Sequence, residues 1–178
     1  MRRCLTLLLI LLGAFAAFAA TGDAPDRKAR FVWGADFGSS IDLSGHDMSS
    51  IDFNAYFGLQ YRWISLFGLG SGADIMVSNS CRTYPVYATL RTSFSAQPKL
   101  LFMDLRGGLA LNYLENETSK TGGYLSTGVG VNLARSRKFV SYIIASYTLV
   151  TRGDVTAGGL RLHYPHLDCV SLRLGITF

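Results

Sequence analysis

Apolar and polar residues alternate one by one at the C-terminal end of the chain. Val170, Leu172, Leu174, Ile176 and Phe178 are apolar, and the residues between them are small or polar. Because successive side chains of a β-strand point to opposite faces, this period of two predicts a strand with one apolar and one polar face.

The same alternation recurs along the chain and predicts eight strands. They lie near residues 31–42, 50–63, 66–77, 83–94, 100–113, 123–134, 139–151 and 168–178. The segment 139–151 is the least regular, because Ile143 and Ile144 are both apolar, and we expect Ile143 on the apolar face. Short connections (64–65, 95–99 and 135–137) alternate with longer ones (43–49, 78–82, 114–122 and 152–167).

The polar face carries many glycines together with charges of both signs in mid-strand. The six charged residues that we place there are Asp36, Asp74, Asp104, Arg91, Arg106 and Arg173. A soluble sandwich, or a secreted barrel of the lipocalin or avidin type, explains the alternation but neither the glycines nor the mid-strand charges. A closed membrane barrel explains both, because small residues and paired charges fill its narrow interior. We therefore expect the three acids to pair with the three arginines in a network that seals the interior. Asp74 and Arg91, on adjacent predicted strands, are one candidate pair. An ion path or a gated pore is the alternative.

Large aromatic residues gather on the apolar face near one end of the predicted strands. They are Phe31, Trp33, Tyr61, Trp63, Phe67, Phe94, Phe139 and Phe178. Such residues belong at the level of lipid headgroups. The predicted fold class is all-β, a monomeric eight-stranded antiparallel up-and-down transmembrane β-barrel. Its short connections and both termini would lie on the periplasmic side, and its long loops outside.

The N-terminal segment has the pattern of an export signal. Arg2 and Arg3 precede an apolar stretch that ends in Ala17-Phe18-Ala19, which suits signal peptidase. We predict a signal peptide over 1–19, a flexible lead over 20–30 and the barrel over 31–178, with an uncleaved membrane anchor as the alternative. Charged residues are only 16% of the chain and hydrophobic ones 49%, which argues against disorder. Without Arg2 and Arg3 the chain has 15 basic and 12 acidic residues, so no nucleic-acid partner is expected.

Two cysteines remain after the predicted leader, Cys81 in the second outer loop and Cys169 near the outer end of the last strand. An exported protein meets oxidising conditions, so a disulfide that clamps the loops is one hypothesis. The strands that carry them lie on opposite sides of the predicted barrel, so two separate thiols are the other.

The long loops carry polar side chains with several possible roles. His46, His163 and His166 could bind a metal, and Ser78 or Ser80 with His46 could form a nucleophile and its base. Their spacing matches no strong motif, and serine is an ordinary loop residue. We therefore expect no catalytic residue, no metal and no other cofactor.

The chain resembles the small eight-stranded outer-membrane barrels of the OmpA/OmpX type. The terminal stretch with Leu174, Ile176 and Phe178 is similar to the signal that such proteins present to the barrel-assembly machinery, and the segment 84–91 resembles a recurrent strand of Bacteroidota barrel proteins. The resemblance implies a Gram-negative outer membrane, with lipid and lipopolysaccharide as neighbours and the assembly machinery as a partner. It implies no particular activity, because this fold has many functions. A structural or surface-exposed role is expected, and a lipid A-modifying enzyme, a narrow channel and an adhesin are the alternatives.

Overall fold

The computed structural model of the protein describes residues 29–45, 48–61, 64–77, 81–94, 100–113, 120–136, 138–151, 155–157, 160–162 and 166–178. The predicted signal peptide and most of the lead lie outside these ranges. Five residues that the sequence analysis singled out also lie outside the described ranges: His46, Trp63, Ser78, Ser80 and His163.

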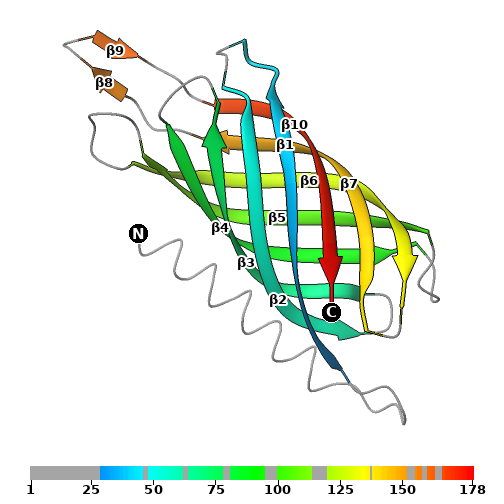
Figure 1. The fold of residues 1–178 in the computed structure, drawn as a ribbon. Helices are drawn as coiled ribbons and strands as arrows, with labels where there is room; N and C mark the ends of the chain where they lie inside the picture. The colour runs from blue at the N-terminus through cyan, green and yellow to red at the C-terminus, as the bar shows by residue number, and fades with distance from the viewer. Residues whose placement is uncertain are drawn as a thin grey trace.

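Eight strands hydrogen-bond side by side into a closed antiparallel barrel (Figure 1). They are β1 (Arg30–Asp42), β2 (Ser50–Tyr61), β3 (Ile64–Met76), β4 (Arg82–Ser93), β5 (Leu101–Tyr113), β6 (Lys120–Arg135), β7 (Val140–Thr151) and β10 (His166–Thr177). The order around the barrel is β1-β10-β7-β6-β5-β4-β3-β2, so chain neighbours pair throughout and β10 closes on β1. The predicted closed, eight-stranded antiparallel up-and-down barrel is confirmed.

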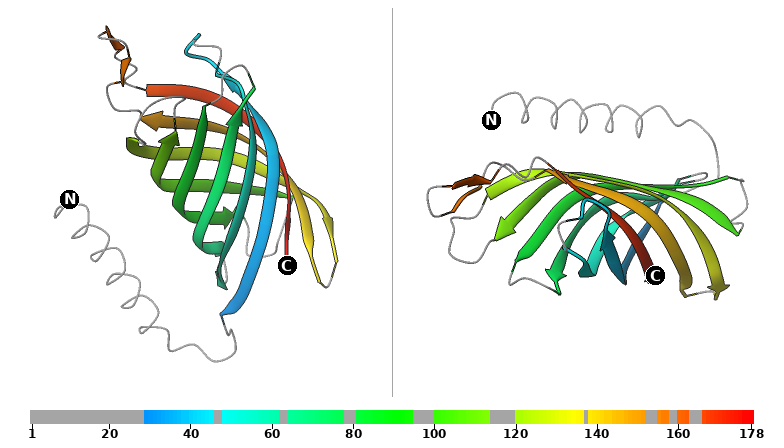
Figure 2. Two further views of the ribbon diagram at one scale, coloured as in Figure 1. Left: turned by 60° about the vertical axis from the view of Figure 1, so that its left-hand side comes forward. Right: turned by 90° about the horizontal axis from the view of Figure 1, so that it is seen from above.

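The structure corrects the expected loop over 152–167. A two-stranded hairpin, β8 (Val155–Ala157) and β9 (Leu160–Leu162), forms there and pairs in register from Val155↔Leu162 to Ala157↔Leu160. The sequence contains the signal that the prediction missed, because Gly-Gly at 158–159 between two short apolar runs is typical of a tight hairpin. Figure 2 shows this hairpin at the end of the barrel opposite the chain's C-terminus.

The barrel wall separates apolar from polar side chains as the alternation predicts. Phe31, Phe37, Leu69 and Leu109 are among the exposed large apolar residues on its outside. On β7, Ile144 is fully buried in the lumen whereas Ile143 faces outward, as expected. Among the described residues, no helix is long and apolar enough to cross a membrane.

Glycines and aromatic rings fit together across neighbouring strands inside the barrel. Each of the five buried inward aromatic residues pairs in register with at least one glycine. These pairs are Tyr56 with Gly34 and Gly70, Tyr87 with Gly70 and Gly108, Phe102 with Gly130, Tyr124 with Gly108 and Tyr142 with Gly175. A Cβ added at Gly175 would meet the Tyr142 ring, and one added at Gly130 would meet the Phe102 ring. The glycines of the polar face therefore make room for the rings that fill the lumen.

The two ends of the barrel differ. At the end with the short connections, the pairing register shifts at three places, around Gln60 in β2, Ser65 in β3 and Leu133 in β6. At the other end, buried inward residues pack into a hydrophobic cluster that we call the hydrophobic cap. It consists of Met76, Tyr87, Ala110, Tyr124, Val150, Leu167 and Cys169, with Met48 and Cys81 packed against it. The barrel is thus more irregular at its short-turn end and capped at its long-loop end.

Candidate functional site in the barrel lumen

The six charged residues predicted for the interior all lie on the inner face of the barrel. Five of them are buried, and Asp74 is half-buried. The prediction omitted Asp52, which is also buried and inward. It shares the inner face of β2 with Asn54 and Tyr56, so the alternation alone could have added it to the set.

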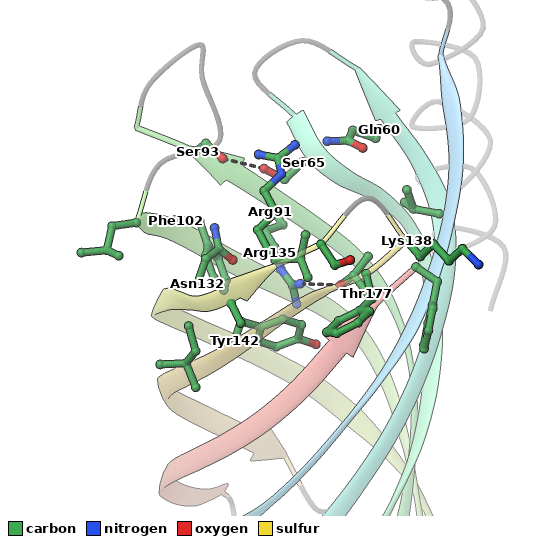
Figure 3. Close-up of a pocket in the computed structure, with 18 of the residues that line it drawn as sticks. Gln60, Ser65, Arg91, Ser93, Phe102, Asn132, Arg135, Lys138, Tyr142 and Thr177 are labelled. Carbon is green, nitrogen blue, oxygen red and sulfur yellow. Dashed lines mark hydrogen bonds between the residues drawn. The ribbon is translucent and has the colours of Figure 1, made fainter.

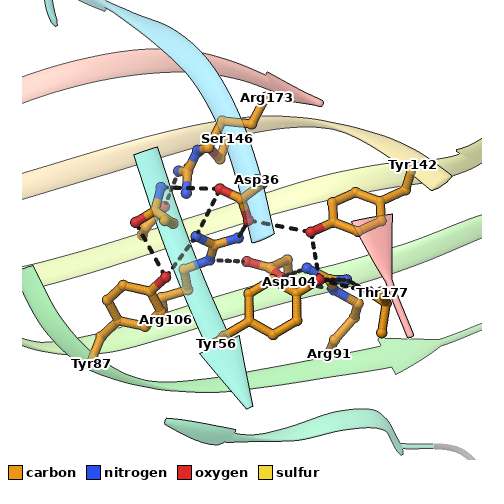
Figure 4. A network of polar contacts seen from close by, with 12 residues as sticks. Asp36, Tyr56, Tyr87, Arg91, Asp104, Arg106, Tyr142, Ser146, Arg173 and Thr177 are labelled. Carbon is orange, nitrogen blue, oxygen red and sulfur yellow. Dashed lines mark hydrogen bonds and ion pairs between the residues drawn. The ribbon is translucent and has the colours of Figure 1, made fainter. Parts of the chain in front are cut away.

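Arg106 is the centre of the network, and none of its surface is exposed (Figure 4). Its Nη2 lies 2.6 Å from Asp36 Oδ2 on β1, and its Nε lies 2.8 Å from Asp104 Oδ1 on its own strand. Its Nη1 also donates to the Tyr87 hydroxyl at 3.2 Å. Asp36 accepts further hydrogen bonds from Asn54 and Tyr142. One guanidinium therefore joins residues from both sides of the lumen.

Arg91 extends this network toward the short-turn end. Its Nη2 lies 2.9 Å from Asp104 Oδ2, so Asp104 is shared between two arginines. The guanidinium carbon also lies over three rings, 4.2 Å from the centre of Tyr142, 4.8 Å from Phe102 and 5.2 Å from Tyr56. These aromatic faces stabilise the buried cation in addition to the carboxylate.

The pairing expected between Asp74 and Arg91 is wrong. Asp74 pairs in register with Thr83, near the long-loop end of β4, whereas Arg91 lies near the other end of that strand. In an antiparallel hairpin, residues at equal distances from the turn are partners, and Asp74 is much closer to the β3–β4 turn than Arg91 is.

Arg173 is buried, and it forms no ion pair with a carboxylate of the described residues. Its Nη2 donates to the hydroxyls of Ser126, Ser146 and Thr148 at 2.9, 2.6 and 3.3 Å. Its Nε and Nη1 have no hydrogen-bond partner. The expected pairing of three acids with three arginines is therefore replaced by a closed group of Asp36, Asp104, Arg91 and Arg106, with Arg173 held separately by hydroxyls.

Asp52 and Asp74 face each other across β2 and β3. Asp52 accepts hydrogen bonds from the hydroxyls of Ser40 and Ser50. Both carboxylates line a small cavity of about 20 Å³ beneath the hydrophobic cap. Such a volume holds about one water molecule.

A much larger cavity opens at the short-turn end of the lumen. Its volume is about 610 Å³, and its inner lining includes Arg91, Phe102 and Tyr142 (Figure 3). Along the barrel axis, the lumen thus runs from this cavity through the Arg91–Arg106 network to the small cavity and the hydrophobic cap. The lumenal chemistry is that of fixed ion pairs and hydroxyl hydrogen bonds, which join strands across the barrel.

Cys81 and Cys169 are not bonded to each other, so the structure does not contain the disulfide offered as one hypothesis. Cys169 is buried in the hydrophobic cap, and Cys81 is partly buried against it. Of the three histidines considered as metal ligands, only His166 is described, and its Nε2 lies 3.9 Å from Asp168 Oδ2. Within the described ranges no group of three or more His, Cys, Asp or Glu side chains could hold a metal ion.

The residues of the proposed assembly signal all lie on the outer face of β10 or directly after it. Leu174, Ile176 and Phe178 are exposed. The Phe178 ring stacks on Trp33 with centroids 4.6 Å apart, and it lies 6.4 Å from the ring of Phe139. The end of β10 therefore joins an aromatic group at the short-turn end of the barrel.

No family model and no curated protein matches the sequence. Solved structures do match the fold. The N-terminal β-barrel domain of Pseudomonas aeruginosa OprF is 11% identical, with a TM-score of 0.54, and the match covers 85% of this chain and 100% of that domain. The Yersinia pestis outer membrane protein Ail, solved in a phospholipid bilayer nanodisc, is 12% identical with a TM-score of 0.46, over 84% of this chain and 100% of that one. The likeness to the OprF domain shows a shared small-barrel fold.

Proposed function

We propose that the protein is an integral outer-membrane barrel with a structural or surface-exposed role, without catalysis and without an open pore. The observation that carries this proposal is the polarity of the wall. Large apolar side chains cover the outside, and a buried charge network fills the inside.

A soluble barrel has the opposite arrangement, because water must meet its outside and its core must be apolar. Phe37, Phe53 and Leu125 each expose more than half of their surface at mid-strand positions of this barrel. Soluble monomers rarely expose contiguous apolar patches beyond a few hundred Å². A bilayer covers such a surface without cost, and a closed barrel leaves no unpaired strand edge in the lipid.

The lumen supports a structural role more than conduction. Arg106 and its two acidic partners lie across its centre, and the tyrosine hydroxyls fill the space around them. The hydrophobic cap that includes Met76 and Leu167 packs inside the barrel toward the long-loop end. An eight-stranded barrel has an interior that side chains just fill.

The orientation that we propose places the short turns and both chain ends in the periplasm. Phe31, Trp33, Phe94, Phe139 and Phe178 are exposed at that end, where they would meet phospholipid headgroups. The hairpin β8–β9 and the other long connections would then face the cell exterior, next to lipopolysaccharide. The exposed end of β10 would be available to the barrel-assembly machinery during insertion.

Cell fractionation with heat-modifiable gel mobility tests this proposal. We expect the protein in the outer-membrane fraction, with a faster band before boiling than after it. Protease added to intact cells should cut within 152–165 and leave the short turns intact. Recovery in the soluble periplasmic fraction would contradict the membrane location, and stepwise conductance in planar bilayers would contradict the sealed lumen.

A further inference from the structure

The cavity of about 610 Å³ at the short-turn end is positively charged. Four cationic residues line it, Arg30, Arg91, Arg135 and Lys138, and none of its described lining residues is Asp or Glu. Asp104 neutralises Arg91. Arg30, Arg135 and Lys138 form no ion pair with any carboxylate of the described residues. Arg30, Arg135 and Lys138 are exposed, so the mouth of the cavity carries three cationic side chains that attract anions.

The irregular strand pairing at this end shapes the cavity. Gln60, Ser65 and Leu133, the three residues at the register shifts, all line it. Bulges re-aim side chains and occur preferentially at barrel rims and beside binding sites. Here they add an amide and a hydroxyl to a wall that also includes the Thr177 hydroxyl, as Figure 3 shows.

Part of the cavity's rim is apolar and continues onto the outer surface of the barrel. Leu100, Leu133, Phe139 and Phe178 line the cavity and are also exposed on the outside of the barrel. A ligand at this mouth would thus contact exposed cations and hydrogen-bond donors on one side and apolar side chains on the other. That combination suits an amphiphile with an anionic head.

We propose that this cavity binds the phosphate of an anionic phospholipid headgroup from the periplasmic leaflet. The guanidinium groups of Arg30 and Arg135 offer the forked donors that match phosphate oxygens, and Lys138 adds a point charge. The volume lies within the range of small-molecule sites, about 300–1,000 Å³. The lipid source rests on the membrane location proposed above, whereas the phosphate chemistry rests on the cavity itself.

Lipid retention measured by native mass spectrometry tests the inference. The protein is refolded into vesicles of phosphatidylcholine with about one tenth phosphatidylglycerol, extracted in neutral detergent, and assayed for bound lipid. We expect retained phosphatidylglycerol, and about a tenfold weaker affinity in Arg135→Gln, since one charge-assisted hydrogen bond corresponds to roughly that factor. The double variant Arg135→Gln/Lys138→Gln should bind phosphatidylglycerol more weakly still. Arg82→Gln removes a matched exposed arginine at the opposite end of the barrel and should change nothing.

Three results would overturn the inference. The first is retention of phosphatidylglycerol that is equal in Arg135→Gln and Arg82→Gln. The second is the absence of retained phosphatidylglycerol in the parent protein. The third is displacement of the lipid by millimolar glycerol phosphate, which would assign the cavity to a soluble phosphate ester. Heat-modifiable mobility in the same vesicles distinguishes failure of the lipid site from failure of the membrane location. A protein that does not insert contradicts the membrane location, whereas a protein that inserts but retains no phosphatidylglycerol contradicts the lipid site.

Discussion

Replacing Arg106 by methionine is expected to leave Asp36 as a buried carboxylate without a cation. Asp36 would keep its hydrogen bonds from Asn54 and Tyr142, at 3.0 and 3.3 Å, but lose the guanidinium 2.6 Å away. Asp104 would still have Arg91. Removing one partner of a buried ion pair costs about 3–5 kcal/mol, so we expect Arg106→Met to lower the free energy of unfolding by that amount.

A second substitution can offset the loss of Arg106, and the ion pairs show which residue to change. Deleting Asp104 together with Arg106 would leave both Asp36 and Arg91 uncompensated. Changing Asp36 to asparagine instead leaves the neutral pair of Arg91 and Asp104 intact and retains an amide that can bond Asn54 and Tyr142. The double variant Arg106→Met/Asp36→Asn should therefore be more stable than Arg106→Met alone, by about 2 kcal/mol.

Urea titration after refolding into short-chain lipid vesicles, followed by tryptophan fluorescence and gel mobility, gives these free energies. Arg82→Met is the matched control, since Arg82 is exposed at a strand end, and it should stay within about 0.5 kcal/mol of the parent. Asp36→Asn is measured alone as well. If the losses of unfolding free energy in Arg106→Met and Asp36→Asn simply add up in the double variant, the two charges do not interact and are screened by water. The sealed lumen would then be the wrong interpretation, and the narrow channel the better one.

Three further predictions concern the wall, the lumen and the cap. Leu109 is 55% exposed on the middle of β5, so Leu109→Arg should destabilise the barrel by about 2–4 kcal/mol in vesicles whereas Leu109→Met is nearly neutral; equal effects would refute the outward assignment. Gly175→Val should cost about 1–3 kcal/mol in urea titration by overpacking against Tyr142, and Tyr142→Ala should suppress that cost; two purely additive losses would contradict the fitted pair. Mass spectrometry after alkylation without reductant should find both Cys81 and Cys169 labelled in the denatured protein and Cys81 alone labelled in the folded one, and a Cys81–Cys169 linked peptide would contradict the absence of that disulfide from the structure.

The strand pattern could be predicted from sequence because it depends on a local rule. Each residue's face follows from its neighbours, so even the ambiguous pair Ile143 and Ile144 was placed correctly once the register of the whole segment was considered. The bulge positions around Ser65 and Leu133 could not be predicted, because the extra residue is fixed by pairing with other strands.

The partners inside the lumen were harder to predict than the faces. Alternation shows that a side chain points inward but not how far along the barrel axis it lies. This is why Asp74 was matched with Arg91 although the two lie at different depths. The hydroxyl ligands of Arg173 were missed for another reason, since Ser126 and Ser146 carry no charge to mark them.

The pairing of rings with glycines has a consequence for how the chain finds its register. Sliding one strand by two residues keeps every apolar side chain outside and preserves the hydrogen-bonding pattern wherever the strands still overlap, so alternation cannot tell the shifted barrel from the native one. The size of the inner residues can. A slip of two would place Tyr56 opposite Val32 or Asp36 instead of Gly34, and Tyr142 opposite Arg173 or Thr177 instead of Gly175. Each ring therefore fits where the neighbouring strand has its glycine, so side-chain volume inside the barrel helps to select one alignment of neighbouring strands.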